Sequence, residues 1–364
     1  MPDENQTMKR NILLFGSSSK LSLNILYCLK DTDFSVHFLS NNTKNAAAYS
    51  RLTASYQLVK GEEWKLDEVV RVILDQKIDL LMPVGEAEVS FIEAYRTELD
   101  QHCICQWVTP AADFKIAINK NALAAELKAT GVPVPIHAPI STEQDILAFT
   151  DTTGFPVLLK PTRSSFGWGI KKFTTLQPLL DHFTKNNLYQ KEYILQQFIV
   201  GSDINCNVLC ENGKVICHSI QESPVRYGVN FSPHDTIKFG PDENVITEVS
   251  KVMSRFNWHG IANIDIRRDH KTKQIYILEI NGRYWGSVIG SLKRAGLNFP
   301  DIAAHYALGE RITIPEMGSG LQVSLARLLR SLLSFNPFSI DDTKFHSYGA
   351  DPKARVMQML EKFR

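Results

Sequence analysis

The chain has 364 residues, of which 44% are hydrophobic, and its 40 Lys and Arg nearly balance its 39 Asp and Glu. A chain of this length is too long for one small core, so we expect two or three lobes with ample apolar material to bury. The net charge of +1 gives no excess of positive charge that would attract nucleic acid or an anionic membrane, and we expect neither as a partner.

Two further features of the sequence bear on location. No apolar run is long enough to span a bilayer, and the first ten residues lack the basic flank and apolar core of a signal peptide. The six cysteines form no C-x-x-C pair and no zinc spacing, which predicts reduced and mostly buried thiols. We therefore expect a cytoplasmic protein.

The first region of the chain alternates buried strands with helices. The segment NILLFG (11–16) has the pattern of a buried strand, and a Ser-Ser-Ser turn (17–19) leads into an apolar-periodic helix over 21–29. The same order repeats further on, which predicts a small open parallel α/β sheet. The serine turn could hold an anion at a helix N-terminus, but it lacks G-x-G-x-x-G, which favours a structural scaffold. Glu86 and Glu88 stand where such a sheet opens to ligand, yet nothing distinguishes them from solvated acids at a helix start.

From Pro110 the pattern changes to one helix over 112–130, ended by Gly131, and a second amphipathic helix follows. The next segment predicts a strand that ends in Lys160, a turn rich in Gly and Ser, and a returning strand. A lysine that enters a loop with free backbone amides suits a flap over phosphates. Gly, Ser and Thr also form ordinary turns, so this segment alone is a weak signal.

The segment 193–218 predicts a strand, a break at Gly201, and a hairpin turned by Asn212 and Gly213. Near the C-terminus, the segment 321–335 predicts a helix whose apolar spacing suits packing against the body or against a second copy. The sequence therefore leaves a homodimer open.

Two apolar runs flank a polar stretch, 269–273, which predicts a second hairpin. Folding this hairpin brings Asp265 opposite Glu279, and two facing carboxylates repel unless a cation lies between them. Glu279 and Asn281 are two apart and share a face of the strand, and such oxygen donors are those that Mg²⁺ selects. Arg283 indicates a site that handles phosphate. Without Arg283, the alternative would be an ordinary amphipathic hairpin whose polar residues, including the E-x-N motif, face water.

The order of these elements between Asn119 and Ser291 resembles the ATP-grasp superfamily, and the ending ING-R-x-WGS is most similar to carbamoyl-phosphate synthase large chains and carboxylate-amine ligases. The resemblance implies an α/β and α+β fold, in which an open parallel α/β domain precedes a two-lobed fold with antiparallel sheets. The implied divisions are an N-terminal domain at 1–110, a small-lobe region with a linker helix at 111–195, a large lobe at 196–316 and a C-terminal helical segment at 317–364.

The resemblance also implies an ATP site. Lys120 would reach the α-phosphate, and Lys160 would contact the α- and β-phosphates. The remaining nucleotide contacts, in the flap, the adenine hinge and the ribose site, would be Ser164, Ser165, Gly167, Gln196, Gln197, Ile199 and Asp203. Where many relatives have a hinge glutamate, Gln196 accepts a hydrogen bond without adding charge. Trp168 makes the flap bulkier than in many relatives, either as a lid over substrate or as packing against the strand below.

The metal and catalytic residues are implied in the same way. Asp265, Glu279 and Asn281 would ligate Mg²⁺ or Mn²⁺, and Arg283 would act beside Lys160 at the γ-phosphate. Alternation along the strand places one of the two aromatic residues after Arg283 in the core and leaves the other to line an acceptor pocket.

A carboxylate is a poor acyl donor, so joining it to an amine requires activation by phosphorylation, and cations must dominate the site. We therefore expect an ADP-forming ligase that acts through an acyl phosphate. Arg226 is the candidate for binding the carboxylate, with a surface arginine on an irregular loop as the alternative. A carbamoyl-phosphate-type synthase and a non-catalytic ATP-binding sensor remain the other functions to test. The sequence identifies neither small-molecule substrate and no base for the amine.

Overall fold

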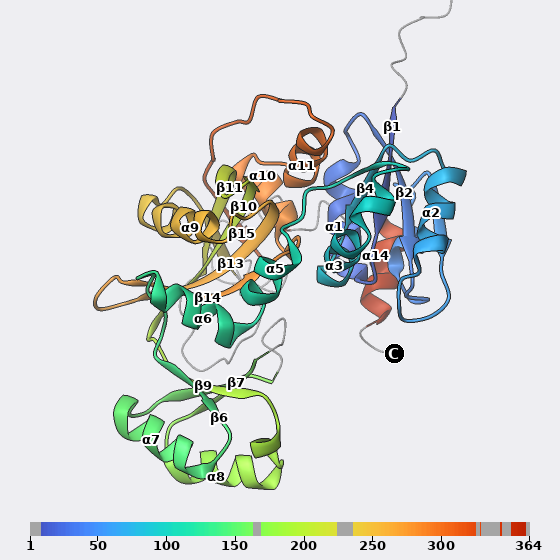
Figure 1. The fold of residues 1–364 in the computed structure, drawn as a ribbon. Coiled ribbons are helices and arrows are strands. Elements are labelled where there is room, and N and C mark those ends of the chain that lie inside the picture. The colour runs from blue at the N-terminus through green and yellow to red at the C-terminus, as the bar shows by residue number, and fades with distance from the viewer. Residues whose placement is uncertain are drawn as a thin grey trace, which may run out of the picture.

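The computed structural model describes the chain at residues 9–162, 169–223, 236–324, 328, 343 and 351–361. These residues form three sheets, each with its own helices (Figure 1). A parallel sheet lies at the right of Figure 1, a large antiparallel sheet at the upper left, and a small antiparallel sheet at the bottom. The predicted fold class is confirmed.

The N-terminal sheet is parallel and has the strand order β3-β2-β1-β4-β5. Its strands are β1 (Arg10–Phe15), β2 (Phe34–Ser40), β3 (Ser55–Leu58), β4 (Leu80–Pro83) and β5 (Ile104–Cys105). The helical segments around it are α1 (Ser19–Leu29), η1 (Ala46–Tyr49), α2 (Leu66–Asp75), α3 (Glu86–Ala94) and α4 (Arg96–Leu99). Alternate residues of β1 enter different cores: Leu13 and Phe15 pack with α2 and α3, whereas Ile12 and Leu14 pack with α1.

The large sheet is antiparallel, with the strand order β14-β13-β10-β11-β12-β15. Its strands are β10 (Gly201–Glu211), β11 (Lys214–Ser223), β12 (Thr236–Phe239), β13 (Gly260–Asp269), β14 (Ile275–Asn281) and β15 (Gly320–Val323). The helices α9 (Glu243–Arg255), α10 (Val288–Ala295) and α11 (Phe299–Ala307) belong to this lobe. Asn212 and Gly213 both have positive φ, 48° and 80°, so the predicted β10–β11 hairpin closes with a primed turn.

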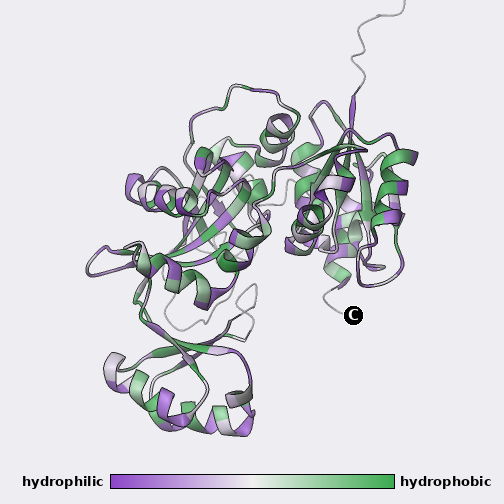
Figure 2. Ribbon diagram, in the orientation of Figure 1, coloured by the Kyte–Doolittle hydropathy of each residue, from purple (hydrophilic) through white to green (hydrophobic). Residues whose placement is uncertain are grey.

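The small sheet has the order β6-β9-β7-β8 and is also antiparallel. Its elements are β6 (His137–Ile140), α7 (Glu143–Thr153), β7 (Val157–Pro161), β8 (Lys171–Phe173), α8 (Leu176–Lys185), η2 (Leu188–Gln190) and β9 (Tyr193–Gln197). Its buried residues form a core separate from the other two. Figure 2 shows hydrophobic residues on the strands and hydrophilic bands along the helices, as expected for helices that cover a sheet on one side.

Two predictions of secondary structure were wrong. The single helix expected over 112–130 is two helices, α5 (Ala111–Ala117) and α6 (Lys120–Ala129), because Asn119 caps the second one. The helix expected from Leu321 does not begin there, because Gly320–Val323 pairs with β12 as strand β15. Most of the segment 325–350 lies outside the described residues.

The last helix, α14 (Pro352–Leu360), returns to the N-terminal domain. The buried Arg355 donates from Nη1 to Asn24 Oδ1 on α1 over 3.2 Å, and Asp351 accepts a hydrogen bond from Ser50. The chain therefore fixes its own end against its first helix (Figure 1). In the described ranges, every helix falls short of the length and apolarity needed to cross a bilayer.

Candidate active site

The hairpin of β13 and β14 places two carboxylates side by side. Asp265 pairs with Glu279 in the register, and Asn263 pairs with Asn281. A register shift follows Asp265, so β14 contains one extra residue, Leu278, next to Glu279. Bulges of this kind re-aim side chains beside functional sites. The polar turn and the pairing are those expected from the sequence.

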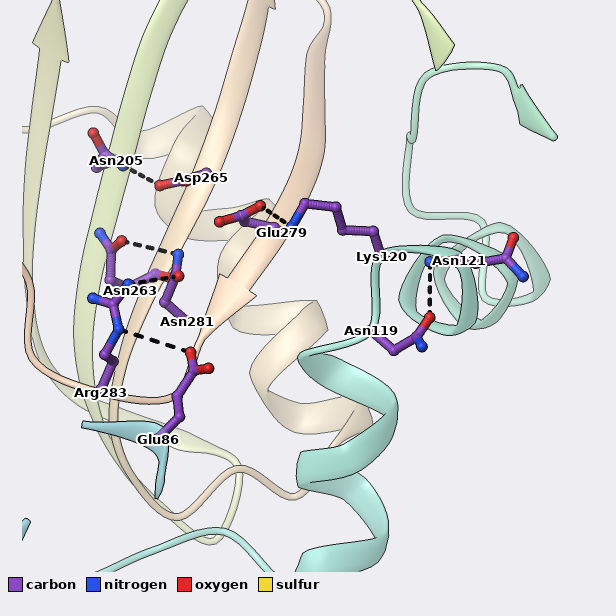
Figure 3. A network of polar contacts seen from close by, with 10 residues as sticks. All are labelled: Glu86, Asn119, Lys120, Asn121, Asn205, Asn263, Asp265, Glu279, Asn281 and Arg283. Atoms are coloured by element: carbon purple, nitrogen blue, oxygen red, sulfur yellow. Dashed lines mark hydrogen bonds and ion pairs between the residues drawn. The ribbon is translucent and has the colours of Figure 1, made fainter. Parts of the chain in front are cut away.

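Lys120 reaches Glu279 from the start of α6. Its Nζ lies 2.8 Å from Glu279 Oε2, so that Glu279 lies between Asp265 and Lys120 (Figure 3). Asn119 Oδ1 caps α6 by accepting from the backbone N–H groups of Asn121 and Ala122, each over 3.1 Å. This cap fixes the first turn of the helix and with it the root of Lys120.

Lys160 lies on β7 of the small lobe with only 5% of its surface exposed. Its pKa is lowered to about 8, because burial and the positive charge of Lys120 lower it by more than the carboxylates of Glu279 and Asp265 raise it. An ammonium group with so little solvent is held by the surrounding charges rather than by water. The structure thus gathers two lysines and two carboxylates from α6, β7, β13 and β14.

Asp265 has a pKa raised well above its ordinary value, because it is buried and because Glu279 adds a second negative charge. Arg283 and Lys120 oppose this shift. Asp265 also accepts a hydrogen bond from Asn205 Nδ2 on the neighbouring strand β10. Two carboxylates in one buried place favour a bound cation, which would remove the cost of holding both charges.

Arg283 is 9% exposed and joins the segment after β14 to the start of α3. Its Nη2 donates to Asn281 Oδ1 over 3.1 Å, its Nη1 donates to Tyr284 O over 2.9 Å, and its Nε lies 3.8 Å from Glu86 Oε1. Glu86 stands directly after β4, at the carboxyl end of the parallel sheet, and burial raises its pKa. Glu86 was not among the site residues predicted from the sequence. Its position at the carboxyl end of a parallel strand was the signal that could have indicated it.

The hinge residues lie on β9 and just after it. Gln196 is buried in the middle of the small sheet, between His137 of β6 and Leu158 of β7. The backbone N–H of Gln197 donates to Ile136 O over 2.8 Å, so this donor is already used within the protein.

Ile199 and Asp203, expected at the adenine and the ribose, share one partner. Arg267 Nε donates to Ile199 O over 3.0 Å, and Arg267 Nη1 forms an ion pair with Asp203. The side chain of Asp203 is 44% exposed, so Asp203 lies nearer to solvent than Lys120 and Lys160 do. Four expected contacts, Ser164, Ser165, Gly167 and Arg226, lie outside the described residues, and so does Trp168.

Both aromatic residues after Arg283 are in the core, which corrects the expectation that one would line a pocket. Tyr284 Oη donates to Gln106 Oε1 over 2.9 Å, and Trp285 Nε1 donates to Ser291 Oγ over 3.3 Å. Strand β14 ends at Asn281, so the alternation used for the prediction does not extend to these positions.

The serine turn after β1 already holds a carboxylate. Glu88 Oε1 accepts from the N–H and the hydroxyl of Ser17 over 3.2 and 3.1 Å and from Trp64 Nε1 over 3.1 Å. This buried side chain takes the place where an anionic ligand would meet the turn. The arrangement favours the scaffold interpretation of the turn.

The donors at β13 and β14 suit a hard cation. They are two carboxylates and one amide oxygen. Among the described residues, no three His, Cys, Asp or Glu side chains lie close enough together to hold a metal ion by themselves. Mg²⁺ commonly takes one or two carboxylates and completes its shell with water and phosphate oxygens. The residues therefore fit Mg²⁺ or Mn²⁺ beside a nucleotide, and they do not fit structural zinc.

Comparison with known proteins shows a family match for part of the chain and solved structures with the same fold. Residues 190–327 match the family model described as ATP-grasp in the biosynthetic pathway with Ter operon. The biotin carboxylase domain of the Hydrogenobacter thermophilus 2-oxoglutarate carboxylase, solved as a dimer with MgADP, ADP and bicarbonate, superimposes with a TM-score of 0.69 at 13% identity. That alignment covers 87% of this chain and 75% of that one.

Two further solved structures share the fold. N5-carboxyaminoimidazole synthetase from Staphylococcus aureus superimposes with a TM-score of 0.67 at 14% identity, over 90% of this chain and 86% of that one. L-amino acid ligase from Bacillus licheniformis superimposes with a TM-score of 0.64 at 19% identity, over 83% of this chain and 75% of that one. Residues 190–327 therefore match an ATP-grasp family model, and the chain shares the fold of these solved structures, in agreement with the resemblance inferred from the sequence.

Proposed function

We propose that the protein is an ATP-dependent ligase that joins a carboxylate to an amine through an acyl phosphate and releases ADP and phosphate. The observation that supports this function best is the meeting of Lys120, Lys160, Glu279 and Asp265, which come from both lobes. A polyanion is the ligand that would balance two buried lysines. A metal ion is what would balance the two carboxylates.

The reaction has two balanced steps. A carboxylate oxygen attacks the γ-phosphorus, the bond to the bridging oxygen breaks, and ADP leaves. The amine nitrogen then attacks the acyl carbon, the bond to the phosphate oxygen breaks, inorganic phosphate leaves, and the nitrogen gives up a proton. The first step needs little base strength, because the nucleophile is already an anion.

Each part of the proposed site has a role in those steps. Lys120 and Lys160 would bind the phosphates, and Arg283 would stabilise the charge that develops at the transferred group. Asp265, Glu279 and Asn281 would hold Mg²⁺, which when bound supplies charge neutralisation at the phosphate oxygens. The proposed ligands of the nucleotide thus extend from the small lobe at 111–195 to the large lobe at 196–316.

Product analysis tests the proposal. Pure protein with ATP and Mg²⁺ is incubated with pooled carboxylates and amines, and ADP, AMP and phosphate are measured. We expect ADP and phosphate only with particular acid–amine pairs. Release of AMP would contradict the acyl phosphate, and tight ATP binding without turnover in any pool would favour a non-catalytic sensor.

A matched pair of variants connects the assay to the site. Glu279→Gln should abolish turnover with the fold intact, because it removes a charge from the proposed metal site. Glu98→Gln makes the same chemical change at an exposed position of α4 and should leave turnover at the wild-type level. Full activity of Glu279→Gln would contradict the assignment of the metal ligands.

Bicarbonate belongs among the tested acids, because one structure of the same fold contains it. ADP release with bicarbonate and no other acid would favour the carbamoyl-phosphate type of synthase. Dependence on an organic acid would favour the ligase.

A further inference from the structure

A row of amide side chains crosses the large sheet behind the proposed metal site. Asn281 Nδ2 on β14 donates to Asn263 Oδ1 on β13 over 3.3 Å, and Asn263 Nδ2 donates to Asn207 Oδ1 on β10 over 2.7 Å. Asn207 Nδ2 donates to Ser219 on β11, to Oγ over 3.0 Å and to the backbone oxygen over 3.3 Å. The four residues are register partners, and each is at most 6% exposed. We call this set, Asn281, Asn263, Asn207 and Ser219, the amide row.

The direction of the hydrogen bonds in the amide row is set at both of its ends, and at the near end Arg283 Nη2 can only donate to Asn281. The backbone oxygen of Ser219 can only accept, so Asn207 must direct its Nδ2 there and its Oδ1 back toward Asn263. By the same argument, Asn263 must direct its Nδ2 toward Asn207 and its Oδ1 toward Asn281. Asn281 then directs its Nδ2 into the amide row and its Oδ1 away from it. The outward oxygen is the atom that accepts from Arg283 Nη2 (Figure 3).

A second row runs beside the first and ends on Asp265. Ser287, the cap of α10, donates to Gln221 Oε1 over 2.7 Å, and Gln221 Nε2 donates to Asn205 Oδ1 over 3.2 Å. Asn205 Nδ2 then donates to Asp265 Oδ1. The two rows have opposite directions, yet both end at the site with oxygen atoms. Asp265 presents oxygen atoms in either case, so the direction of a row decides only which atom Asn281 presents.

Burying the polar side chains of the amide row costs free energy, and the need to fill the core does not explain why polar side chains occupy these positions. Buried amides must find all their partners, whereas apolar side chains would fill the same face of the sheet without that requirement. Hydrogen bonds that hold a metal ligand from the side away from the metal commonly contribute 10- to 100-fold to metal affinity. A flipped Asn281 would turn N–H groups toward the cation.

We propose that Asn263 and Asn207 are positioning residues for the metal site, which hold Asn281 with its Oδ1 toward the cation. The inference rests on the proposed function, because it assumes that Asn281 is a metal ligand. Asn207 is two strands away from Asn281 and acts only through Asn263, so its effect on the metal would be indirect.

Metal binding by variants tests the proposal without catalysis. The affinity for Mn²⁺ is measured by electron paramagnetic resonance with ADP saturating, and the affinity for ADP is measured in EDTA. Asn207→Ala should weaken Mn²⁺ binding about tenfold or more and leave ADP binding in EDTA unchanged. Asn263→Ala, one step closer, should do the same and serves if Asn207→Ala fails to fold.

Two comparisons separate positioning from general damage. Cys206→Ala changes a fully buried side chain on the same strand but on the opposite face, in the core with α9, and should lower stability without altering Mn²⁺ affinity. In an Asn281→Ala background, Asn207→Ala should cause no further loss of Mn²⁺ affinity, because the oriented atom is already gone.

The outcomes distinguish this proposal from the proposed function. Wild-type Mn²⁺ affinity in Asn281→Ala would contradict the metal site itself. Weak binding in Asn281→Ala together with wild-type binding in Asn207→Ala and Asn263→Ala would overturn only the positioning role. Additive losses in the double variant would also overturn it.

Discussion

If Lys160 binds the phosphates of a nucleotide as proposed, its buried ammonium group should make nucleotide binding dependent on pH. With a pKa of about 8, the side chain is protonated in about 90% of molecules at pH 7 and in about 10% at pH 9. If the phosphates need the charged form, ADP binding should weaken about tenfold between pH 7 and pH 9. The measurement is titration calorimetry with ADP in EDTA, which removes metal ions from the comparison.

Variants at position 160 show whether this residue causes the effect. Lys160→Met should bind ADP weakly at both pH values, and Lys160→Arg should bind with little change between them, because a guanidinium group remains charged. Lys171→Met, at an exposed position of β8, should keep the wild-type profile. A flat wild-type profile, or a tenfold change that persists in Lys160→Met, would refute the reasoning.

The same shift has a consequence for stability. The pKa of Lys160 is lowered from 10.5 to about 8, so the unfolded chain binds more protons between these values and folding gains stability as pH rises through that window. Below pH 8 the buried charge costs about 3 kcal/mol. Lys160→Met should therefore raise the melting temperature of the ligand-free protein at pH 7, and the gain should shrink toward pH 10.5.

Three other predictions concern single side chains. Asp203→Asn should raise the KM for ATP about tenfold and change the KM for 2′-deoxy-ATP much less; equal effects on both would contradict a ribose contact. Asn119→Ala should cost about 1 kcal/mol of stability and weaken ADP binding through Lys120, whereas removal of the α7 cap by Thr142→Ala should cost stability alone. Trp258→Ala, in the centre of a core, should cost about 3–5 kcal/mol, as measured by thermal melting; a loss under 1 kcal/mol would contradict its burial.

The sequence predicted the pairing of β13 with β14 well, because the information that specifies a hairpin is local. Alternation along each strand and a polar turn between them were enough to pair Asp265 with Glu279. The extra residue Leu278 was not predicted, since a bulge leaves no clear mark in the alternation. The hairpin at Asn212 and Gly213 was predicted for the same local reason.

The errors arose where distant parts of the chain decide the structure. The apolar period runs through Asn119 without interruption, so only its capping bonds reveal a helix start. The apolar spacing of the segment that forms β15 predicts a helix, but the segment is a strand because it pairs with β12, which lies far away in the sequence. The approach of Glu86 to Arg283 joins the first domain to the large lobe across almost 200 positions of sequence, and no short-range pattern encodes it.

The isolated core of the small lobe has a thermodynamic consequence. Its buried side chains share no cluster with those of the other two cores in the described parts of the chain, so heating the ligand-free protein should produce two calorimetric transitions rather than one. A ligand that contacts Lys160 on one side and Glu279 on the other would couple these units. Cooperativity of melting then becomes a property that the ligand confers.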